Sequence, residues 1–574
     1  KKRHFRTLRS SLRSPTLRKQ LRKLPPLHQE EEEVANSPAA NMSSISFKVG
    51  QRVHSVGDPR RIGTVKYVGT VEGYSGSWVG VDWDNGEGKH DGTVNGVRYF
   101  QARSDRSASL VRPQNLSASI SFLEALCIRY KGQSTKEEEE EMYVLSGKNR
   151  RVPVEFLGKE KIQDKLSRFD ELTNASLSFL GVSTPGSSED ISSTVPNIKE
   201  LDLTGNLLSE WKDIGIIYEQ LPCLTALNLS HNLMSDVVTG LPQLSRIRVL
   251  VLNCTGIKWT QVEELKPLLP VIEELHLMGN GICEIKPTSS IVQGFETLRL
   301  LNLEDNCIAE WAEILKLSML TSLEHLQLNK NKLKSVFYPD DDTVQKMLNG
   351  FHLQEKGCIP FRNLRNLLLA SNNIEDLASI DSLNLFPNLM DIRISENPIT
   401  EPARGGIPRF VLLARLSKVE MLNGSEVRVR DRKECEIRYV RLVMSQLHDK
   451  PDEIKKLHPR FSELKRLHGI EDERPSTVAA GPQKMAAGLL SVTLKCVGAS
   501  MGEKDPITKK LPASTTVGKL KILCEIFFKL RSVKPKLYLE EESSPLPQLL
   551  DEEMASLVDV GVGNGSTILV DEES

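Results

Sequence analysis

The sequence predicts a multidomain protein that consists of a small all-β barrel, an α/β solenoid with a C-terminal cap, and a second small domain of mixed α and β structure. Three observations predict this fold class. Short apolar runs broken by glycines extend from Phe47 to Pro113, a leucine motif recurs at intervals that are mostly 23 to 26 residues, and a strand-strand-helix-strand-strand pattern follows Leu489. A chain of 574 residues is also long enough for several domains of ordinary size.

The overall composition argues against two classes of partner. A formal net charge of -1 at pH 7 does not suit a chain that binds nucleic acid over its whole surface, so we expect no nucleic-acid partner. No apolar run approaches the roughly 18 residues that a membrane-spanning helix needs. We therefore expect no membrane partner.

The cysteines and histidines show no metal-binding or disulfide spacing. Cysteines stand singly with no C-x-x-C pair, and no H-E-x-x-H motif is present. This pattern favours buried apolar thiols in a reducing compartment, so we expect no metal and no cofactor. No nucleophile and base set is recognisable either, so we do not expect an enzyme. The nine cysteines are Cys127, Cys223, Cys254, Cys283, Cys307, Cys358, Cys435, Cys496 and Cys524.

The first part of the chain differs from the rest. It is rich in arginine, lysine and serine, and its first acidic residue is Glu30, where an acidic run begins. A transit peptide or a basic nucleic-acid-binding arm could have this composition. Met42 stands just before the first ordered pattern. We expect residues 1–44 to be a disordered tail, or an extension that is not part of the native chain.

Residues 45–116 are predicted to form the all-β barrel, and their most unusual stretch is "EGKHDGTVNGVRYF", residues 87–100. A phosphate-binding loop would need Lys89 to be followed by serine or threonine and a helix, but strand-like residues follow instead. A glycine-hinged loop that displays one lysine beside aromatic residues suits an extended peptide with an anionic end. The lysine would pair with a carboxylate, and Trp78 with Phe100 would hold an apolar side chain. These two aromatic residues could equally belong to the barrel core.

The segments "WVGVDWD", "GKHDG", "YF" and "LVRP" together resemble a CAP-Gly domain, whose signature is the pentapeptide GKNDG. The resemblance implies a site that grips the acidic, aromatic C-terminal tail of α-tubulin or of end-binding proteins. The residues that it implies for tail binding are Trp78, Gly88, Lys89, His90, Asp91, Gly92 and Phe100.

Within this resemblance, Lys89 and His90 would meet the acidic groups of the tail, and Gly88 and Gly92 would shape the loop. His90 departs from the usual asparagine of the pentapeptide. A neutral imidazole still offers one donor, but the strength of the contact would become dependent on pH.

Residues 117–195 are expected to connect the barrel to the start of the solenoid and include a charge run from Lys136 to Met142 that we expect to be solvated. Residues 196–400 contain eight matches to L-x-x-L-x-L-x-x-N-x-L, which is typical of leucine-rich repeats. An insertion between the sixth and seventh copies contains the acidic segment "YPDDDT", a candidate binding loop. The repeat anchors are Asn206, Asn232, Thr255, Asn280, Asn306, Asn331, Asn372 and Asn397.

Each repeat is predicted to place a short strand on a concave face and to turn its anchor side chain inward, where it bonds backbone groups. Thr255 replaces asparagine, and we expect a local accommodation there and not a break. The outward residues suggest a protein-binding surface, although the repeats could instead only hold neighbouring domains apart. These outward residues are Asp202, Asn228, Val251, His276, Asn302, Gln327, Leu368 and Arg393.

The remainder of the chain is predicted to contain a helical cap over residues 401–448, a linker over 449–488 and a final domain over 489–574. The final domain resembles the ubiquitin-like β-grasp fold, with a helix cap near Thr515 and an apolar helix face of Val517, Leu520, Leu523 and Phe527. The sequence ends in Asp-Glu-Glu-Ser and not in Gly-Gly, so we expect no conjugation through this C-terminus.

This order of domains resembles the tubulin-folding cofactor family. The resemblance implies a cytoplasmic, cytoskeleton-associated chaperone that binds α-tubulin and, with β-tubulin and cofactors B, C and D, assembles or dissociates the tubulin heterodimer. Two alternatives stay open: a microtubule-associated CAP-Gly scaffold, and a ubiquitin-pathway adaptor whose partners are ubiquitin-receptor or proteasome proteins.

Overall fold

The fold is taken from a computed structural model. In it, no described helix has the length and hydropathy of a membrane span. The described residues are 47–117, 120–131, 143–145, 151–153, 167–340, 359–401, 406–446, 456–470, 489–498, 504–513, 515–530, 534–540, 547–550, 553, 555–557 and 560–572. The predicted extension over residues 1–44, the charge run from Lys136 to Met142 and most of the insertion between the sixth and seventh repeats lie outside them.

The barrel is an antiparallel sheet of five strands in the order β6-β3-β2-β1-β7, with a separate β4-β5 hairpin. Alternating apolar residues put Val53, Val65, Val79, Val81 and Trp83 into one core. The strands are β1 (Arg52–Ser55), β2 (Asp58–Val71), β3 (Tyr74–Trp83), β4 (Thr93–Val94), β5 (Val97–Arg98), β6 (Ala108–Val111) and β7 (Leu116–Ser117). The all-β prediction for this region is confirmed.

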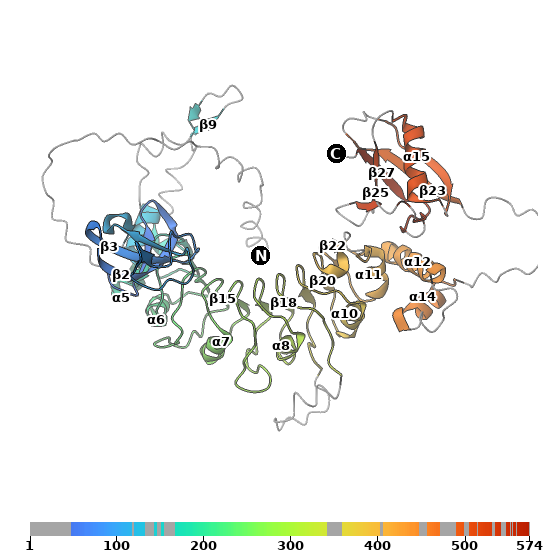
Figure 1. Ribbon diagram of the computed structural model, residues 1–574. Coiled ribbons are helices and arrows are strands. Elements are labelled where there is room, and N and C mark those ends of the chain that lie inside the picture. The colour runs from blue at the N-terminus through green and yellow to red at the C-terminus, as the bar shows by residue number, and fades with distance from the viewer. Residues whose placement is uncertain are drawn as a thin grey trace, which may run out of the picture. The chain divides into compact units, whose positions relative to one another are not determined.

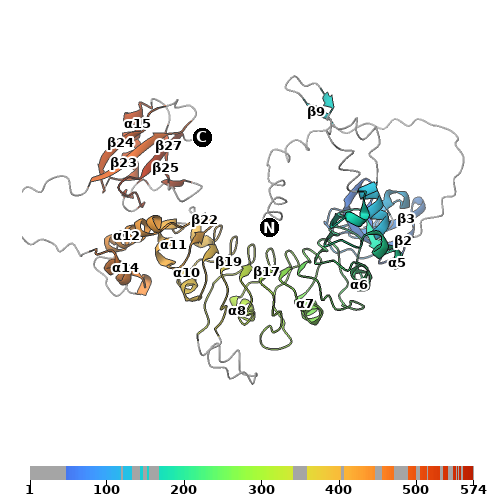
Figure 2. The ribbon, with the colours of Figure 1, turned by 180° about the vertical axis from the view of Figure 1, so that it is seen from behind.

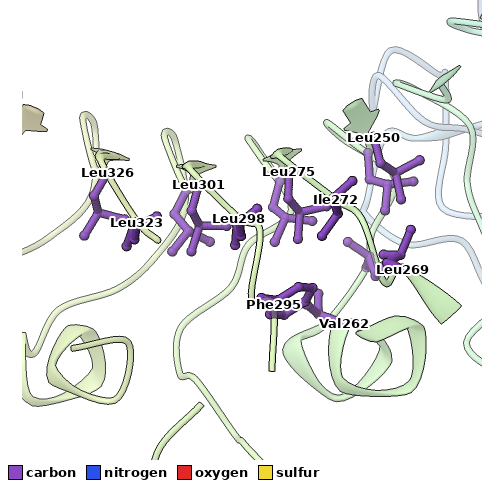
Figure 3. Close-up of a cluster of buried hydrophobic side chains, with 14 of the residues drawn as sticks. Leu250, Val262, Leu269, Ile272, Leu275, Phe295, Leu298, Leu301, Leu323 and Leu326 are labelled. Atoms are coloured by element: carbon purple, nitrogen blue, oxygen red, sulfur yellow. The ribbon is translucent and has the colours of Figure 1, made fainter. Parts of the chain in front are cut away.

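The solenoid is an 11-stranded sheet that is parallel from β11 to β21 and ends in the antiparallel β21-β22 pair. Most of these strands have three residues and follow one another along the solenoid (Figure 1). The middle residue, usually leucine, is buried in the core. Figure 3 shows Leu250, Leu275, Leu301 and Leu326 in such a row. The strands are β11 (Asn174–Ser176), β13 (Glu200–Asp202), β14 (Ala226–Asn228), β15 (Val249–Val251), β16 (Glu274–His276), β17 (Leu300–Asn302), β18 (His325–Gln327), β19 (Asn366–Leu368), β20 (Asp391–Arg393), β21 (Met421–Leu422) and β22 (Ser425–Glu426).

Short helices connect several of these strands, and three of them begin with a buried tryptophan. The helices are α5 (Ser188–Thr194), α6 (Trp211–Gln220), α7 (Trp259–Leu265), α8 (Trp311–Leu315) and α10 (Leu377–Ser382). The predicted outward residues lie at the third position of their strands, and most are partly exposed. Asn302 is the exception, because only 2% of it is exposed.

The anchor asparagines form the predicted ladder. The Asn306 amide donates to the carbonyls of Leu277 and Leu303, each at 3.0 Å, and its Oδ1 accepts from the N–H groups of Asn280 and Ile282. Thr255 is fully buried, and its hydroxyl donates to the carbonyl of Leu252 at 2.9 Å. The sheet continues through β15, so the expected local accommodation is confirmed.

Both ends of the solenoid core are covered by helices. At the start, β8 (Ile120–Ser121) pairs with β12 (Val182–Thr184), and α2 (Phe122–Leu126) joins the solenoid core. Ser121 and Glu124 form a capping box at α2. A β9-β10 hairpin (Tyr143–Leu145 and Arg151–Pro153) follows.

At the other end the cap contains α11 (Arg409–Arg415), α12 (Val429–Gln446) and α14 (Phe461–Leu467). The sequence predicts a linker over residues 449–488, but α14 packs on the cap through Phe461 and Leu464. The apolar spacing of α14 is what distinguishes this segment from a linker.

The C-terminal domain is a β-grasp domain, as expected. Helix α15 (Val517–Phe528) packs on one face of a five-stranded sheet in the order β24-β23-β27-β25-β26 (Figure 2). The helix cap is Thr516, whose hydroxyl accepts from the Lys519 N–H at 3.4 Å, one residue from the predicted position. The strands are β23 (Leu489–Cys496), β24 (Ile507–Pro512), β25 (Pro535–Glu540), β26 (Gln548–Leu550) and β27 (Thr567–Glu572). β26 is one strand more than the sequence pattern predicted.

Candidate peptide-binding site

The pentapeptide loop, residues 88–92, lies against the start of β6. The backbone N–H groups of Lys89 and His90 both donate to the carbonyl of Ala108, at 2.6 and 3.1 Å, and the Ala108 N–H donates to the carbonyl of His90 at 2.9 Å. A Cβ on Gly88 would lie 2.3 Å from the Ser107 carbonyl carbon. Only glycine fits there, so the loop is held close to β6.

Position 92 also requires glycine, because of its backbone conformation and a close contact with the chain. Its φ is +101°, and a Cβ would lie 2.0 Å from the carbonyl oxygen of Phe100. The Gly92 carbonyl accepts from the N–H of Tyr99 at 3.0 Å. The two glycines therefore fix the path of the chain on both sides of Lys89 and His90, as the sequence predicts.

His90 is half-buried and takes part in the loop through its ring. Its Nδ1 accepts a hydrogen bond from the Gly92 N–H at 3.1 Å, which assigns the proton of the neutral ring to Nε2. Burial lowers the pKa of His90 and the neighbouring Lys89 lowers it further, while Asp91 opposes both. The neutral imidazole thus combines an acceptor for the loop with a donor on its other nitrogen. An asparagine side chain offers the same pair of groups.

Asp91 is occupied within the loop. Its Oδ1 accepts from the N–H of Thr93 at 3.0 Å, and its Oδ2 pairs with Arg98 at 2.7 Å. The hydrogen bonds from Thr93 lower the pKa of this carboxyl. Its contacts are those of a residue that holds the β4-β5 hairpin against the loop.

Lys89 extends from this fixed frame into solvent. Its side chain is exposed, and within the described part of the chain its ammonium has no hydrogen-bond or ion-pair partner. The barrel over residues 47–117 contains ten lysines and arginines against seven aspartates and glutamates. An anionic partner would therefore meet a basic domain that displays this cation on a rigid loop.

Phe100 and Trp78 lie on the same side of β3 but have different neighbours. Phe100 is only 9% exposed and packs so closely on Gly80 that a Cβ there would lie 2.3 Å from its ring. Trp78 is half-buried, with the Arg112 guanidinium 3.8 Å from its ring centroid and the Tyr74 ring at 5.8 Å. Phe100 is thus close to a core residue, whereas Trp78 retains surface for a partner.

The indole N–H of Trp78 is buried and has no hydrogen-bond partner among the described residues. An unsatisfied buried donor of this kind is uncommon. Because Arg112 covers the ring, a partner that displaced the guanidinium would gain access to the ring face.

Several neighbours of the site were missed from the sequence. Tyr67 is paired with Gly80 in the β2-β3 register, its ring is 5.2 Å from that of Tyr99, and both extend the aromatic face around Phe100. Arg98 and Arg112 were missed because their partners depend on strand pairing. The alternation of inward and outward residues along β3 was the one sequence pattern that pointed to an aromatic face around Phe100.

The described residues contain no group of three or more histidine, cysteine, aspartate or glutamate side chains that could hold a metal ion. No disulfide joins the eight described cysteines. Their expected burial is wrong for most of them: only Cys524 is buried, and Cys127 and Cys283 are exposed. Cys358 lies outside the described residues.

The fold and the loop define a CAP-Gly protein with leucine-rich repeats and a ubiquitin-like domain, and the family model for the CAP-Gly domain matches residues 49–116. A tubulin-folding cofactor E from Arabidopsis thaliana is 63% identical over 93% of this chain and 100% of its own length. A tubulin-specific chaperone E from Danio rerio is 32% identical over 91% of this chain and 98% of its own. The chain belongs to the tubulin-folding cofactor E family.

A solved structure, the C-terminal ubiquitin-like domain of mouse tubulin-specific chaperone E, is also similar. It is 27% identical, covers 16% of this chain and 96% of that domain, and has a TM-score of 0.15.

Proposed function

We propose that this protein is a tubulin-folding chaperone of the cytoplasm that holds α-tubulin by the C-terminal tail. The observation that carries the proposal is the exposed ammonium of Lys89, which has no partner among the described residues and stands on a loop fixed by Gly88 and Gly92. The names of its relatives support tubulin as the client. The protein acts with β-tubulin and cofactors B, C and D to assemble or dissociate the α/β heterodimer.

The proposed contact has three parts. The Lys89 ammonium pairs with a carboxylate of the tail, and the His90 Nε2–H donates to a second carboxylate oxygen. Trp78, with its indole donor, receives the terminal aromatic side chain of the tail. Phe100, which is nearly buried, supports the loop from the side of the barrel. Asp91 contributes by holding the loop through Thr93 and Arg98.

The first test measures binding of a synthetic α-tubulin tail peptide to the full chain. We expect Lys89→Ala to weaken binding by about tenfold, because a charge-assisted hydrogen bond contributes roughly 1.5 kcal/mol or more. Removal of the terminal aromatic residue of the peptide should have a similar effect. The matched control is Lys66→Ala, which removes an exposed lysine of β2 outside the loop and should leave affinity unchanged.

Unchanged affinity for both Lys89→Ala and the shortened peptide would mean that the tail does not bind at this loop. An equal loss in Lys89→Ala and Lys66→Ala would reduce the contact to a general charge effect and would also contradict the proposed site.

A further inference from the structure

Two cysteines of consecutive repeats are neighbours on the surface of the solenoid. Cys283 follows the fourth anchor, Asn280, by three residues, and Cys307 directly follows the fifth anchor, Asn306. Cys283 is exposed and Cys307 is partly exposed, so a small reagent in solution reaches both. We call these two residues the inter-repeat thiol pair.

The backbone holds the inter-repeat thiol pair in register. The N–H of Cys307 donates to the carbonyl of Ile282, the residue before Cys283, at 2.9 Å. The Oδ1 of Asn306 accepts from the N–H of the same Ile282 at 3.0 Å. With standard bond lengths, the first of these bonds leaves the Cα atoms of the two cysteines at most about 7 Å apart, which is the upper end of what a disulfide spans.

The two thiols also interact with each other. Desolvation raises the pKa of Cys283, and the Cys307 thiol raises it further through its charge and through a hydrogen bond. Lys332 of the next repeat lowers this pKa and Glu284 raises it, both to a smaller extent. Side chains form a hydrogen bond only at short range, so the two sulfur atoms are neighbours as well as the two backbones. The Cys283 thiol in addition donates to the carbonyl of Gly281 at 3.4 Å.

A second pair of cysteines, in the ubiquitin-like domain, provides an internal comparison. Burial raises the pKa of Cys524 to about 12, and the charge of Cys496 contributes to this shift. Cys524 is fully buried in the core of that domain, however, whereas both members of the inter-repeat thiol pair are accessible. A soluble oxidant therefore has access to one pair and not to the other.

We propose that Cys283 and Cys307 are a modification site for a peroxide, which converts the thiol pair into a disulfide between the fourth and fifth repeats. The thiolate of Cys307 attacks hydrogen peroxide, the O–O bond breaks, and a sulfenic acid forms on Cys307 with release of water. The sulfur of Cys283 then loses its proton and displaces the hydroxyl group, so that the S–S bond forms and a second water leaves. Two thiols are oxidised and one peroxide is reduced to two waters.

The first attack is assigned to Cys307 because the proton of Cys283 is engaged by the carbonyl of Gly281. The disulfide ties together two repeats that are otherwise joined by backbone and anchor hydrogen bonds, and a thiol reductant restores the pair. Transient disulfides of this kind are the usual form in compartments that keep thiols reduced. The site is independent of the pentapeptide loop on the barrel.

The test treats the folded full chain with hydrogen peroxide, blocks the remaining thiols by alkylation and maps disulfides by mass spectrometry after trypsin digestion. Cys283 and Cys307 fall in separate tryptic peptides, residues 259–299 and 300–316, and each peptide contains one cysteine. We expect these two peptides to become linked and the link to disappear after treatment with dithiothreitol. Peptides linked through the buried second pair should be at least about tenfold less abundant.

Two serine variants test the order of the steps and the specificity of the site. In Cys283→Ser the sulfenic acid on Cys307 has no second thiol to react with, so dimedone should trap it in about fivefold higher yield than in the wild-type protein. The matched control is Cys127→Ser, which removes another exposed cysteine and should leave the yield of the linked peptides unchanged. Mapping on the wild-type protein does not depend on the folding of either variant.

Absence of the linked peptides at peroxide concentrations that oxidise Cys127 would overturn the proposal. So would equal yields of the inter-repeat link and of the link between Cys496 and Cys524, or a dimedone adduct in Cys283→Ser no more abundant than in the wild-type protein. A link that formed only in urea would show that the folded repeats keep the two sulfur atoms apart, and would overturn it as well.

Discussion

His90 shows how one residue can preserve the geometry of the pentapeptide loop with a different side chain. Its Nδ1 accepts from the Gly92 N–H at 3.1 Å, so the ring must be neutral for the loop to keep this bond. Burial and Lys89 lower its pKa and support the neutral form. Protonation would place a second N–H against that of Gly92 and remove the acceptor.

The first prediction concerns His90→Asn. Asparagine provides both an acceptor and a donor, so we expect tail affinity at neutral pH to stay within about twofold. Once the pH falls below the lowered pKa of His90, the wild-type protein should lose about fivefold in affinity. The broken loop hydrogen bond costs about 1 kcal/mol, more than a partly exposed charge gains. The variant should lack this loss.

The stability of the folded protein should change with pH in the same direction as the affinity. A lowered pKa means that the unfolded chain binds more protons than the folded one, so stability falls as pH decreases from about 6.5 through the folded pKa. Peptide titrations from pH 5 to 8 check the affinity, and urea denaturation over the same pH range checks the stability. Identical pH profiles for His90→Asn and wild type would contradict the role assigned to the ring.

The second prediction compares two glycines of positive φ. Gly92→Ala should abolish measurable tail binding, because its Cβ would lie 2.0 Å from the Phe100 carbonyl oxygen and the loop must move. Gly96, with φ of +81°, has open space where a Cβ would lie, with nothing within 4 Å. Gly96→Ala should therefore cost only backbone strain of about 1 kcal/mol and retain binding. Equal binding by both variants would show that the loop tolerates displacement.

The pentapeptide, Trp78 and Phe100 could be identified from the sequence because they belong to short sequence motifs. The pairing of Asp91 with Arg98 and the stacking of Arg112 on Trp78 could not, because they depend on which strands become neighbours. Phe100 was expected to face a ligand, yet it packs closely on Gly80 of β3, a contact between segments distant in sequence that the sequence does not specify.

At the scale of the repeat, the ladder asparagines satisfy backbone groups that the turn of each repeat leaves unpaired. Asn306 uses both ends of its amide, but the Oδ1 of Asn232 has no partner among the described residues. Both side chains are buried. The two positions therefore differ in how many backbone groups they serve.

This difference gives the third prediction. Asn306→Ala should lower the free energy of unfolding by about 4 kcal/mol, because it leaves two N–H and three C=O groups without their side-chain partner. Asn232→Ala should cost about 2 kcal/mol, since only carbonyl partners are lost. Urea denaturation followed by circular dichroism measures both. Equal losses of unfolding free energy in the two variants would contradict the view that the hydrogen bonds accepted by the asparagine Oδ1 stabilise the repeat.

The repeats were predictable as elements because their leucines recur at nearly regular intervals, and nearly every expected anchor is buried. The ends were harder to predict. The strand β11 does not match the leucine motif of the repeats. The segment from residue 456 to 470 joins the cap through Phe461 and Leu464, and through a buried ion pair between His468 and Glu436. Contacts between segments distant in sequence decide such boundaries.

At the scale of the whole molecule, the three kinds of domain offer chemically different surfaces. The barrel presents a lysine on a rigid loop, the solenoid a mixed polar face, and the ubiquitin-like domain the exposed isoleucines of α15. A chaperone that acts on a two-chain client needs more than one contact. The tail site alone would bind tubulin in any state of assembly.

The most direct test mixes the purified chain with soluble tubulin heterodimer and follows dimer integrity by analytical ultracentrifugation, with co-pelleting on microtubules in parallel. We predict that the heterodimer dissociates, that Lys89→Ala slows this loss, and that the chain does not pellet with the polymer. Decoration of microtubules without loss of soluble heterodimer would contradict the chaperone function and favour a microtubule-associated scaffold.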